Sequence, residues 1–303
     1  MKCDDRIVNE ILELKKRRNA VILAHNYQIG EVQDIADFVG DSLRLSQQAA
    51  ATNADVIVFC GVHFMAETAS ILSPTKTVLL PDPNAGCPMA DMVTADKLRK
   101  FKQEHPGMPV VCYVNSSADV KAESDYCCTS ANAVKVVETI DADEIIFVPD
   151  QHLGHYASTK SSKKIILWNG FCPTHRRITP DALMKQKDLH PNAKVVVHPE
   201  CLEEVIKLSD AVASTEGILR YARETDAEEF IIGTEVGILH RLNKENPGKK
   251  FYPAFERAIC PNMKKITLEK VLWSLQDLSH VVSVPEETAK RAKLAIDRMI
   301  AIV

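Results

Sequence analysis

Three cysteines with the same neighbour are the residues of this chain best suited to chemistry. Cys87, Cys172 and Cys260 are each followed by proline, and Cys172 comes shortly after a β-branched apolar run that ends at Trp168 and breaks at 169–170. A thiol on a loop at the end of a strand can ligate a metal or react as a thiolate. Three such loops predict one shared site.

The cysteines belong to a pattern that recurs three times. The segments NADVIVFCG, DADEIIFVP and DAEEFIIGT look alike. Twelve residues before the alanine of each segment stands a hydroxyl residue, and 17 residues before that a polar residue ends an apolar run. From these polar residues to the three cysteines the intervals are 62, 59 and 62 residues. The hydroxyl residues are Ser42, Ser130 and Thr215, and the polar residues are His25, Tyr113 and His198.

The elements that must position these residues alternate between helix and strand. Strand, helix and strand at this spacing imply parallel sheets with crossover helices, and a long internal repeat implies repeated units. We therefore expect an α/β fold of three pseudo-threefold-related α/β/α units with short parallel sheets around a central active-site cavity. The expected units are 1–88, 89–173 and 174–261. The C-terminal helices in 262–303 are expected to pack back on the first unit.

Two helices near the N-terminus can be placed more closely. The sequence predicts a first helix over about 5–18 and another over about 32–38, with a strand ending at His25 between them. In open parallel sheets, ligands bind beyond the carboxyl ends of the strands. The polar residues of the repeat all lie at such ends, so we expect them to meet in the cavity.

Composition excludes several classes of function. The 303-residue chain has an apolar fraction of 46%, a charged fraction of 26% and a formal net charge of -4, which creates no general field that attracts nucleic acid or anionic lipid. The N-terminal MKCDDRIVNE has acids where a signal peptide needs an apolar stretch, and no apolar run approaches the ~20 residues of a membrane span. We expect a cytoplasmic protein with no nucleic-acid or membrane partner. Nine cysteines, an odd number in a reducing compartment, do not suggest a disulfide framework.

Three thiolates without an obvious fourth ligand leave two metal centres open. One is zinc with an open coordination position, and the other is a [4Fe-4S] cluster in which one iron lacks a protein ligand. Soft thiolates do not distinguish the two. Because the chain lacks the CxxC pair usual in structural zinc sites, we favour the cluster. The remaining cysteines, among them Cys60, Cys112, Cys127, Cys128 and Cys201, are expected to serve packing.

Further polar side chains at the strand ends could move protons or bind anions. The acid–base candidates are His25, Tyr27, Tyr113, Asn115, His175, His198 and Glu200. The hydroxyls of Ser42, Ser130, Ser214 and Thr215 are suited both to capping helices and to binding carboxylate or phosphate at a helix N-terminus. The chain has no Walker loop, GxGxxG after a strand, GxSxG or HExxH, which argues against nucleotide cofactors, serine hydrolysis and zinc peptidase chemistry.

Several longer motifs resemble one family. AHNYQIGEVQDIADFVGDS, PDPNAGCPMAD, CYVNSSADVKAESDYCCTSANA, WNGFCPTH, VVVHPEC and GTEVGI are similar to those of the NadA-type quinolinate synthase family, over about residues 20–275. The resemblance implies three pseudo-symmetric domains around an oxygen-sensitive [4Fe-4S] cluster held by Cys87, Cys172 and Cys260. It implies condensation of iminoaspartate with dihydroxyacetone phosphate to quinolinate, with release of phosphate and two waters. An L-aspartate oxidase or aspartate dehydrogenase would supply the iminoaspartate.

The resemblance also assigns roles to individual residues. Glu200 would be the general base, with Tyr27, Tyr113 and His175 in proton transfer, and the open iron would act as a Lewis acid. The residues implied to bind substrate are His25, Ser42, Tyr113, Asn115, Ser130, His198, Glu200, Ser214 and Thr215. Cys260 stands alone in CPNM, so the extra cysteine pair that some members have near this ligand is missing. The alternatives are a zinc- or cluster-dependent hydratase or hydrolase acting on a small polycarboxylate, and a non-enzymatic iron–sulfur sensor.

Overall fold

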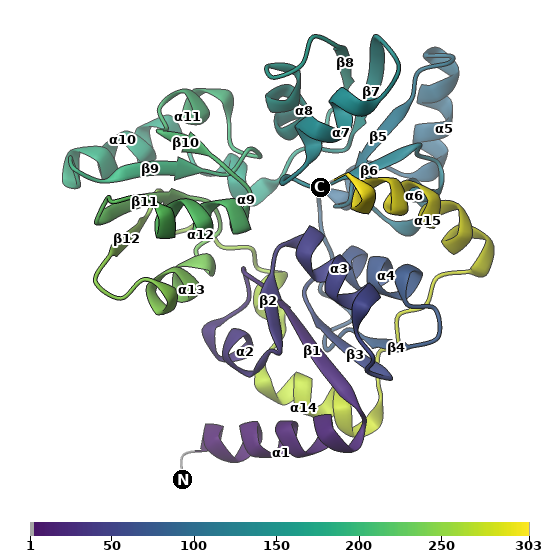
Figure 1. Ribbon diagram of the computed structural model, residues 1–303, viewed down its shortest axis with the longest axis vertical. Helices are drawn as coiled ribbons and strands as arrows, with labels where there is room; N and C mark the ends of the chain where they lie inside the picture. Colours follow the sequence, from purple (N-terminus) through teal and green to yellow (C-terminus); the bar gives the residue numbers. More distant parts are fainter. Residues whose placement is uncertain (1–2, 303) are drawn as a thin grey trace.

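The chain forms three lobes around a common centre in the computed structural model, which describes residues 3–302 (Figure 1). Met1, Lys2 and Val303, which the predicted first unit and C-terminal segment include, lie outside the described residues. Each lobe holds one four-stranded parallel sheet made from a continuous stretch of chain. The predicted α/β class with three related units is confirmed. The boundaries after 88, 173 and 261 stay a prediction.

The three sheets have the same strand order. They run β2-β1-β3-β4, β6-β5-β7-β8 and β10-β9-β11-β12. The first lobe contains α1 (Cys3–Arg17), β1 (Ala20–His25), α2 (Gly30–Ile35), β2 (Phe38–Gly40), α3 (Ser42–Ala51), β3 (Val56–Cys60), α4 (His63–Leu72) and β4 (Thr77–Leu79), followed by the short turn η1 (Ala90–Met92).

The second and third lobes repeat this series. The second contains α5 (Ala95–Glu104), β5 (Val110–Tyr113), α6 (Ala118–Ala122), β6 (Tyr126–Cys128), α7 (Ala133–Thr139), β7 (Glu144–Val148), α8 (Gln151–Ser158), β8 (Lys164–Leu167) and α9 (Pro173–Arg176). The third contains α10 (Pro180–Leu189), β9 (Lys194–Val197), α11 (Glu203–Lys207), β10 (Ala211–Val212), α12 (Thr215–Glu224), β11 (Glu229–Gly233), α13 (Ile238–Glu245), β12 (Lys250–Pro253) and η2 (Met263–Lys265).

Burial of the central strands on both faces explains their composition. Every residue of β3 (VIVFC) is buried, as are all four residues of β5. Parallel strands that helices cover on both sides read as continuous apolar runs rather than alternating ones. The repeated apolar runs that indicated strands are therefore central strands of the three sheets, whereas the run before Trp168 is the edge strand β8, which is only partly buried.

The helix expected over 32–38 is wrong in its second half. α2 ends at Ile35, and Phe38–Gly40 forms the edge strand β2 beside β1. Asp37 explains the change, because its N–H donates to the carbonyl of Ile22 at 2.9 Å and its carboxylate accepts the N–H of Ile22 at 2.8 Å. Both bonds hold the segment after Ala36 beside β1, and this pairing outweighs the tendency of the segment to continue the helix.

The two C-terminal helices pack on different lobes. α14 (Leu268–Asp277) lies against α1 and β3 of the first lobe, as expected. α15 (Glu286–Ala301) lies mainly against α6 and β6 of the second lobe (Figure 1), which corrects the expectation that both return to the first. Its buried stripe, Ala292, Ala295, Ile296 and Met299, is complementary to that surface.

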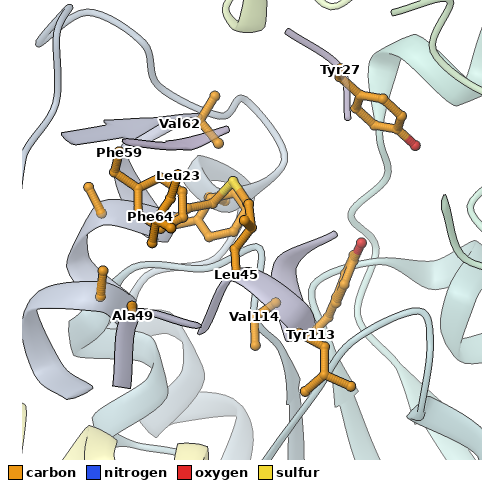
Figure 2. Close-up of a cluster of buried hydrophobic side chains, with 14 of the residues drawn as sticks. Leu23, Tyr27, Leu45, Ala49, Phe59, Val62, Phe64, Tyr113 and Val114 are labelled. Carbon is orange, nitrogen blue, oxygen red and sulfur yellow. The ribbon is translucent and has the colours of Figure 1, made fainter. Parts of the chain in front are cut away.

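The main core runs through the lobes and ends at the central cavity. The larger cluster of buried residues includes the strands of the first two sheets, α14, α15 and one face of the third sheet, while a smaller cluster packs on the other face of the third sheet. Figure 2 shows Tyr27 and Tyr113 set apart from the aliphatic cluster around Leu23 and Phe59, with their hydroxyls on the sides that face each other. Among the described residues, no helix is long and apolar enough to cross a membrane.

A candidate active-site cavity

The carboxyl ends of the three sheets open into one cavity of about 220 Å³. With the exception of Ser214, every residue that the sequence predicted for the site lines it. The lining contributed by these residues comprises His25, Tyr27, Ser42, Cys87, Tyr113, Asn115, Ser130, Cys172, His175, His198, Glu200, Thr215 and Cys260. The repeat therefore delivers equivalent strand ends to a common space, as the spacing predicted.

The three cysteine loops have the same local form. A short helical turn follows each Cys-Pro pair, namely η1, α9 and η2. Cys172 is the N-cap of α9 and Pro173 fills the first helical position, where the missing N–H costs nothing. Each sulfur is half-buried at the cavity wall. Pro173 thus starts the turn after Cys172, whereas Pro88 and Pro261 lie two residues before η1 and η2.

The thiols are close enough to affect one another. Burial raises the pKa of Cys87 to about 12, with a contribution from the charge of Cys260. Burial and the charge of Glu200 raise the pKa of Cys172, and Cys87 adds to the effect. Three thiols that resist ionisation in a shared cavity become good ligands once a cation replaces their protons.

The separation of the thiols bears on the kind of metal. Among the described residues, the three sulfur atoms are not grouped within 4.8 Å of one another; the group that meets this limit is Cys172, His175 and Glu200. Thiolates on one tetrahedral zinc, at ~2.3 Å from the metal, would lie ~3.8 Å apart. As the side chains stand, the three sulfurs do not form the compact set that a single zinc ion requires.

A continuous chain of hydrogen bonds crosses the cavity wall. The Glu200 carboxylate lies 2.6 Å from Nδ1 of His175, and Nε2 of His175 lies 2.8 Å from the hydroxyl of Thr234. That hydroxyl lies 2.5 Å from the phenol of Tyr27. All four side chains are buried. With Nδ1–H donated to Glu200, a consistent arrangement has Thr234 donating to Nε2 and accepting from Tyr27.

The protonation states at rest suit this arrangement. Burial and the charge of Glu200 hold the pKa values of Tyr27 and Tyr113 well above the ordinary value of tyrosine. Burial alone would raise the pKa of Glu200, but hydrogen bonds from His175 and Tyr113 stabilise the carboxylate and keep its pKa below the ordinary value. The Glu200 carboxylate is therefore a base that stands next to two protonated phenols.

His25 and His198 share a geometry that follows from the repeat. Nδ1 of His25 accepts the N–H of Tyr27 at 3.2 Å, and Nδ1 of His198 accepts the N–H of Glu200 at 3.3 Å. Burial is the main cause that lowers the pKa of each to about 3. Both rings are thus neutral with the proton on Nε2, and in His198 this nitrogen lies 3.1 Å from the hydroxyl of Ser130. Each ring can donate a hydrogen bond.

The four predicted hydroxyls fall into two groups. Ser214 caps α12 by accepting the N–H of Gly217 at 3.2 Å and does not line the cavity. Ser42, Ser130 and Thr215 line the cavity, and Asp41 rather than a hydroxyl caps α3. Asn115 also lines the cavity, and its buried Oδ1 has no hydrogen-bond partner. An orphaned acceptor of this kind costs free energy unless a ligand satisfies it.

The sequence did not single out Asp41, Arg177 or Glu235, which also line the cavity. It also did not single out Thr234, which is hydrogen-bonded to Tyr27 and His175. Thr234 and Glu235 directly follow β11, a strand whose carboxyl end was already expected at the site. Applying the strand-end rule to the third strand of each unit would have found them. The five cysteines expected to pack, Cys60, Cys112, Cys127, Cys128 and Cys201, are buried in strands or beside them.

Comparisons with known proteins point to one family. Residues 9–301 match the family model described as quinolinate synthetase A protein. The chain is 59% identical over 297 residues to quinolinate synthase of Dehalococcoides mccartyi strain CBDB1, covering 98% of both chains. It is 57% identical over 296 residues to quinolinate synthase 1 of Methanosarcina acetivorans, covering 98% of this chain and 97% of the relative. It is 56% identical over 300 residues to quinolinate synthase of Thermodesulfovibrio yellowstonii, covering 99% of both.

Proposed function

Because the chain belongs to the quinolinate synthetase A family, we propose that it condenses iminoaspartate with dihydroxyacetone phosphate to quinolinate, releasing phosphate and two waters. The members of this family are enzymes of NAD biosynthesis that act on small molecules. One observation carries the proposal for this chain. Three repeat-equivalent thiols meet the Glu200, His175, Thr234 and Tyr27 chain in one cavity.

We further propose that Cys87, Cys172 and Cys260 hold a [4Fe-4S] cluster. The fit rests on three thiols at one cavity wall, spaced too widely for a single zinc and with no fourth cysteine in the lining. When bound, a cluster with three cysteine ligands supplies an iron that can polarise a substrate oxygen. The rest of the chemistry belongs to the side chains of this protein.

The donors of the cavity match two anionic substrates. Ser42 and Thr215 stand in the first turns of α3 and α12, where a helix N-terminus favours carboxylate or phosphate. Neutral His25 and His198 add Nε2–H donors, and Ser130 lies beside His198. We propose that these groups, with Asn115, orient the carboxylates and the phosphate. Ser214 would contribute indirectly, by fixing the first turn of α12.

Arg177 is the cavity's arginine, and no other arginine or lysine appears in its lining. Its guanidinium forms no ion pair among the described residues, whereas Arg44 and Arg241 nearby bond to Glu216 and Lys264 bonds to Glu235. An exposed, uncommitted cation at the wall can attract anions and offset the carboxylates of the site. We assign it the capture of the substrate phosphate.

The hydrogen-bond chain provides the proton transfers that the condensation needs. Joining the two carbon skeletons requires removal of a proton from carbon, and each departing water requires a proton on its oxygen. Ionised Glu200 can take the proton from carbon, and protonated Tyr27 and Tyr113 can supply the protons that the departing oxygens need. Thr234 and His175 connect the base to Tyr27 without solvent. The wall residues therefore separate acid and base roles by their surroundings.

Two other functions are less well supported. The group of Cys172, His175 and Glu200 could in principle hold zinc for a hydrolase or hydratase acting on a polycarboxylate. Its compactness, however, is explained by His175 Nδ1, which lies 2.6 Å from Glu200 and 3.2 Å from the Cys172 sulfur, so this nitrogen is engaged as a donor. A non-enzymatic sensor would need neither the proton chain nor the orphaned acceptor of Asn115.

Purification without oxygen tests the proposal. The protein should be brown, contain about four irons per chain, and form quinolinate from iminoaspartate and dihydroxyacetone phosphate. A colourless zinc protein that leaves both substrates unchanged would refute it. Since iminoaspartate hydrolyses in water, it should be generated in the assay by an L-aspartate oxidase or aspartate dehydrogenase, the kind of partner that we propose in the cytoplasm.

A further inference from the structure

Glu235 is a fully buried carboxylate beside the third cysteine loop, and it takes no part in the proton chain. It lies two residues beyond the end of β11 and is 0% exposed. Its Oε1 accepts the backbone N–H of Cys260 at 3.1 Å, and its Oε2 accepts the N–H of Gly237 at 2.7 Å. The carboxylate therefore holds the main chain of a proposed metal ligand.

Lys264 balances this charge and ties the cysteine loop to another lobe. Its Nζ lies 2.9 Å from Oε1 and 3.2 Å from Oε2 of Glu235, and it donates to the backbone carbonyl of Tyr27. A Cβ at Gly237 would lie 2.7 Å from Nζ and 2.8 Å from both Oε2 and the Tyr27 carbonyl oxygen. Only glycine fits against an ion pair packed this closely.

The second lobe has an acid at the equivalent position. Asp150 stands 22 residues before Cys172, and Glu235 stands 25 before Cys260, which is the same three-residue difference as in the repeat intervals. Asp150 is also 0% exposed, and its backbone pairs with Gly170, two residues before Cys172. Two lobes thus place a buried acid after the third strand, next to the cysteine loop.

The first lobe dispenses with the acid. Val62 takes its place, 25 residues before Cys87. There the backbone N–H of His63 donates to the carbonyl of Ala85 at 2.8 Å and holds the loop through main-chain atoms alone. Fixing the loop therefore does not in itself need an acid, and the Glu235–Lys264 ion pair of the third lobe requires another explanation.

We propose that Glu235 is a positioning residue for the Cys260 loop, and that its pairing with Lys264 tunes the charge at the metal centre. The inference rests on the iron–sulfur centre of the proposed function. Hydrogen bonds and net charge around a cluster set its reduction potential. Glu235 occupies the Cys260 N–H and adds a negative charge, which Lys264 offsets. Removing either partner should change the potential in opposite directions.

Redox titration of the anaerobically purified full-length protein tests this. Glu235→Gln leaves the lysine unbalanced and should raise the reduction potential, whereas Lys264→Met leaves the carboxylate unbalanced and should lower it. The double variant should return toward the wild-type value. Glu123→Gln is the matched control, because Glu123 is also paired with cations, Arg99 and Arg291, but does not line the cavity. Its potential should stay at the wild-type value.

Iron retention gives a second measurement. Glutamine has one acceptor oxygen for the two N–H groups of Cys260 and Gly237 and no charge to strengthen the bond. Glu235→Gln should therefore release iron to a chelator about tenfold faster than wild type or Glu123→Gln. Shifts of the same sign in the two single variants, or an unchanged potential with full iron content, would overturn the inference. If Glu235→Gln does not fold, the sign of the shift in Lys264→Met decides. A wild-type protein without iron would instead refute the proposed function.

Discussion

Replacing Thr234 with valine should break the hydrogen-bond chain between His175 and Tyr27 without changing the packing around it. Thr234 is 1% exposed, and its hydroxyl lies 2.5 Å from the Tyr27 phenol and 2.8 Å from His175 Nε2. Valine has nearly the same shape but no hydroxyl. Both neighbours therefore lose a hydrogen-bond partner, while the surrounding packing is kept.

The size of the effect follows from what the hydroxyl connects. A positioned acid–base group contributes roughly 10²–10⁴ to a rate, so kcat should fall about 10²-fold to 10³-fold. KM should change little, because the hydroxyl has both its bonds to protein groups. The free energy of unfolding should fall by about 1–3 kcal/mol, the cost of leaving buried polar groups unpaired.

Steady-state quinolinate formation under anaerobic conditions measures kcat and KM, and urea unfolding measures stability. Thr234→Ser is the matched control, because it restores the hydroxyl and should recover most of the rate. Iron content must equal that of wild type, so that a lost metal centre is not mistaken for a broken chain. A Thr234→Val enzyme with full iron and a kcat within about twofold of wild type would refute the relay.

Three other perturbations test separate parts of the site. Cys172→Ala should lose its iron and colour, while the far-ultraviolet circular dichroism, which reports the backbone fold, stays unchanged. A brown variant with full iron content would remove Cys172 from the ligand set. Arg177→Gln should raise KM for dihydroxyacetone phosphate about threefold to fivefold at low salt with kcat unchanged. Arg176→Gln is the control and should leave KM unchanged, because the Arg176 guanidinium stacks on a phenyl ring. Equal effects of the two substitutions would contradict the phosphate role of Arg177. The pKa values of His25 and His198 are lowered to about 3, so the unfolded chain binds more protons below its own histidine pKa of about 6.5. Stability is then complete above that pH and should fall by roughly 1.4 kcal/mol per pH unit for each histidine as the pH drops from 6.5 to 5, measured by urea unfolding. A flat profile would show that the two rings take up protons as readily in the folded protein as in the unfolded chain, which would contradict the lowered pKa values.

The fold and most of the cavity lining could be predicted because the repeat constrains the backbone. Strand length, helix length and crossover geometry are nearly fixed in a parallel unit, so equal intervals along the chain become equivalent places in space. The interval from His25 to Cys87 equals that from His198 to Cys260. That equality is sufficient to predict that residues from different lobes meet in one cavity.

Contacts between lobes could not be predicted in the same way. Thr234 meets Tyr27 and His175 only because the three lobes pack at particular angles, and no spacing within one unit records those angles. Glu235 is a similar case, since its cation comes from the segment after the third ligand. α15 follows the same logic, because its apolar stripe fits either of two lobes in sequence and selects the second through shape.

Local propensity also failed where one residue could play two parts. Ser214 and Thr215 are adjacent and equally good helix starters in sequence, yet Ser214 caps α12 and Thr215 faces the cavity. The cap needs a side chain that folds back onto the N–H of Gly217, which turns the next residue outward. The capping and binding interpretations are therefore divided between neighbours, and the geometry of the first turn decides which is which.

The equivalent strand ends show how a symmetric fold supports an asymmetric reaction. His25, Tyr113 and His198 occupy the same backbone position, but two of them are neutral imidazoles and the third is a phenol that bonds to Glu200. Only the third unit carries a carboxylate two residues later, where the first has Tyr27 and the second Asn115. Symmetry gathers three loops at one centre, and these differences supply a base, an acid and an unpaired acceptor on its three sides. A substrate that used all three would be held in a single orientation, which a threefold-identical site could not achieve.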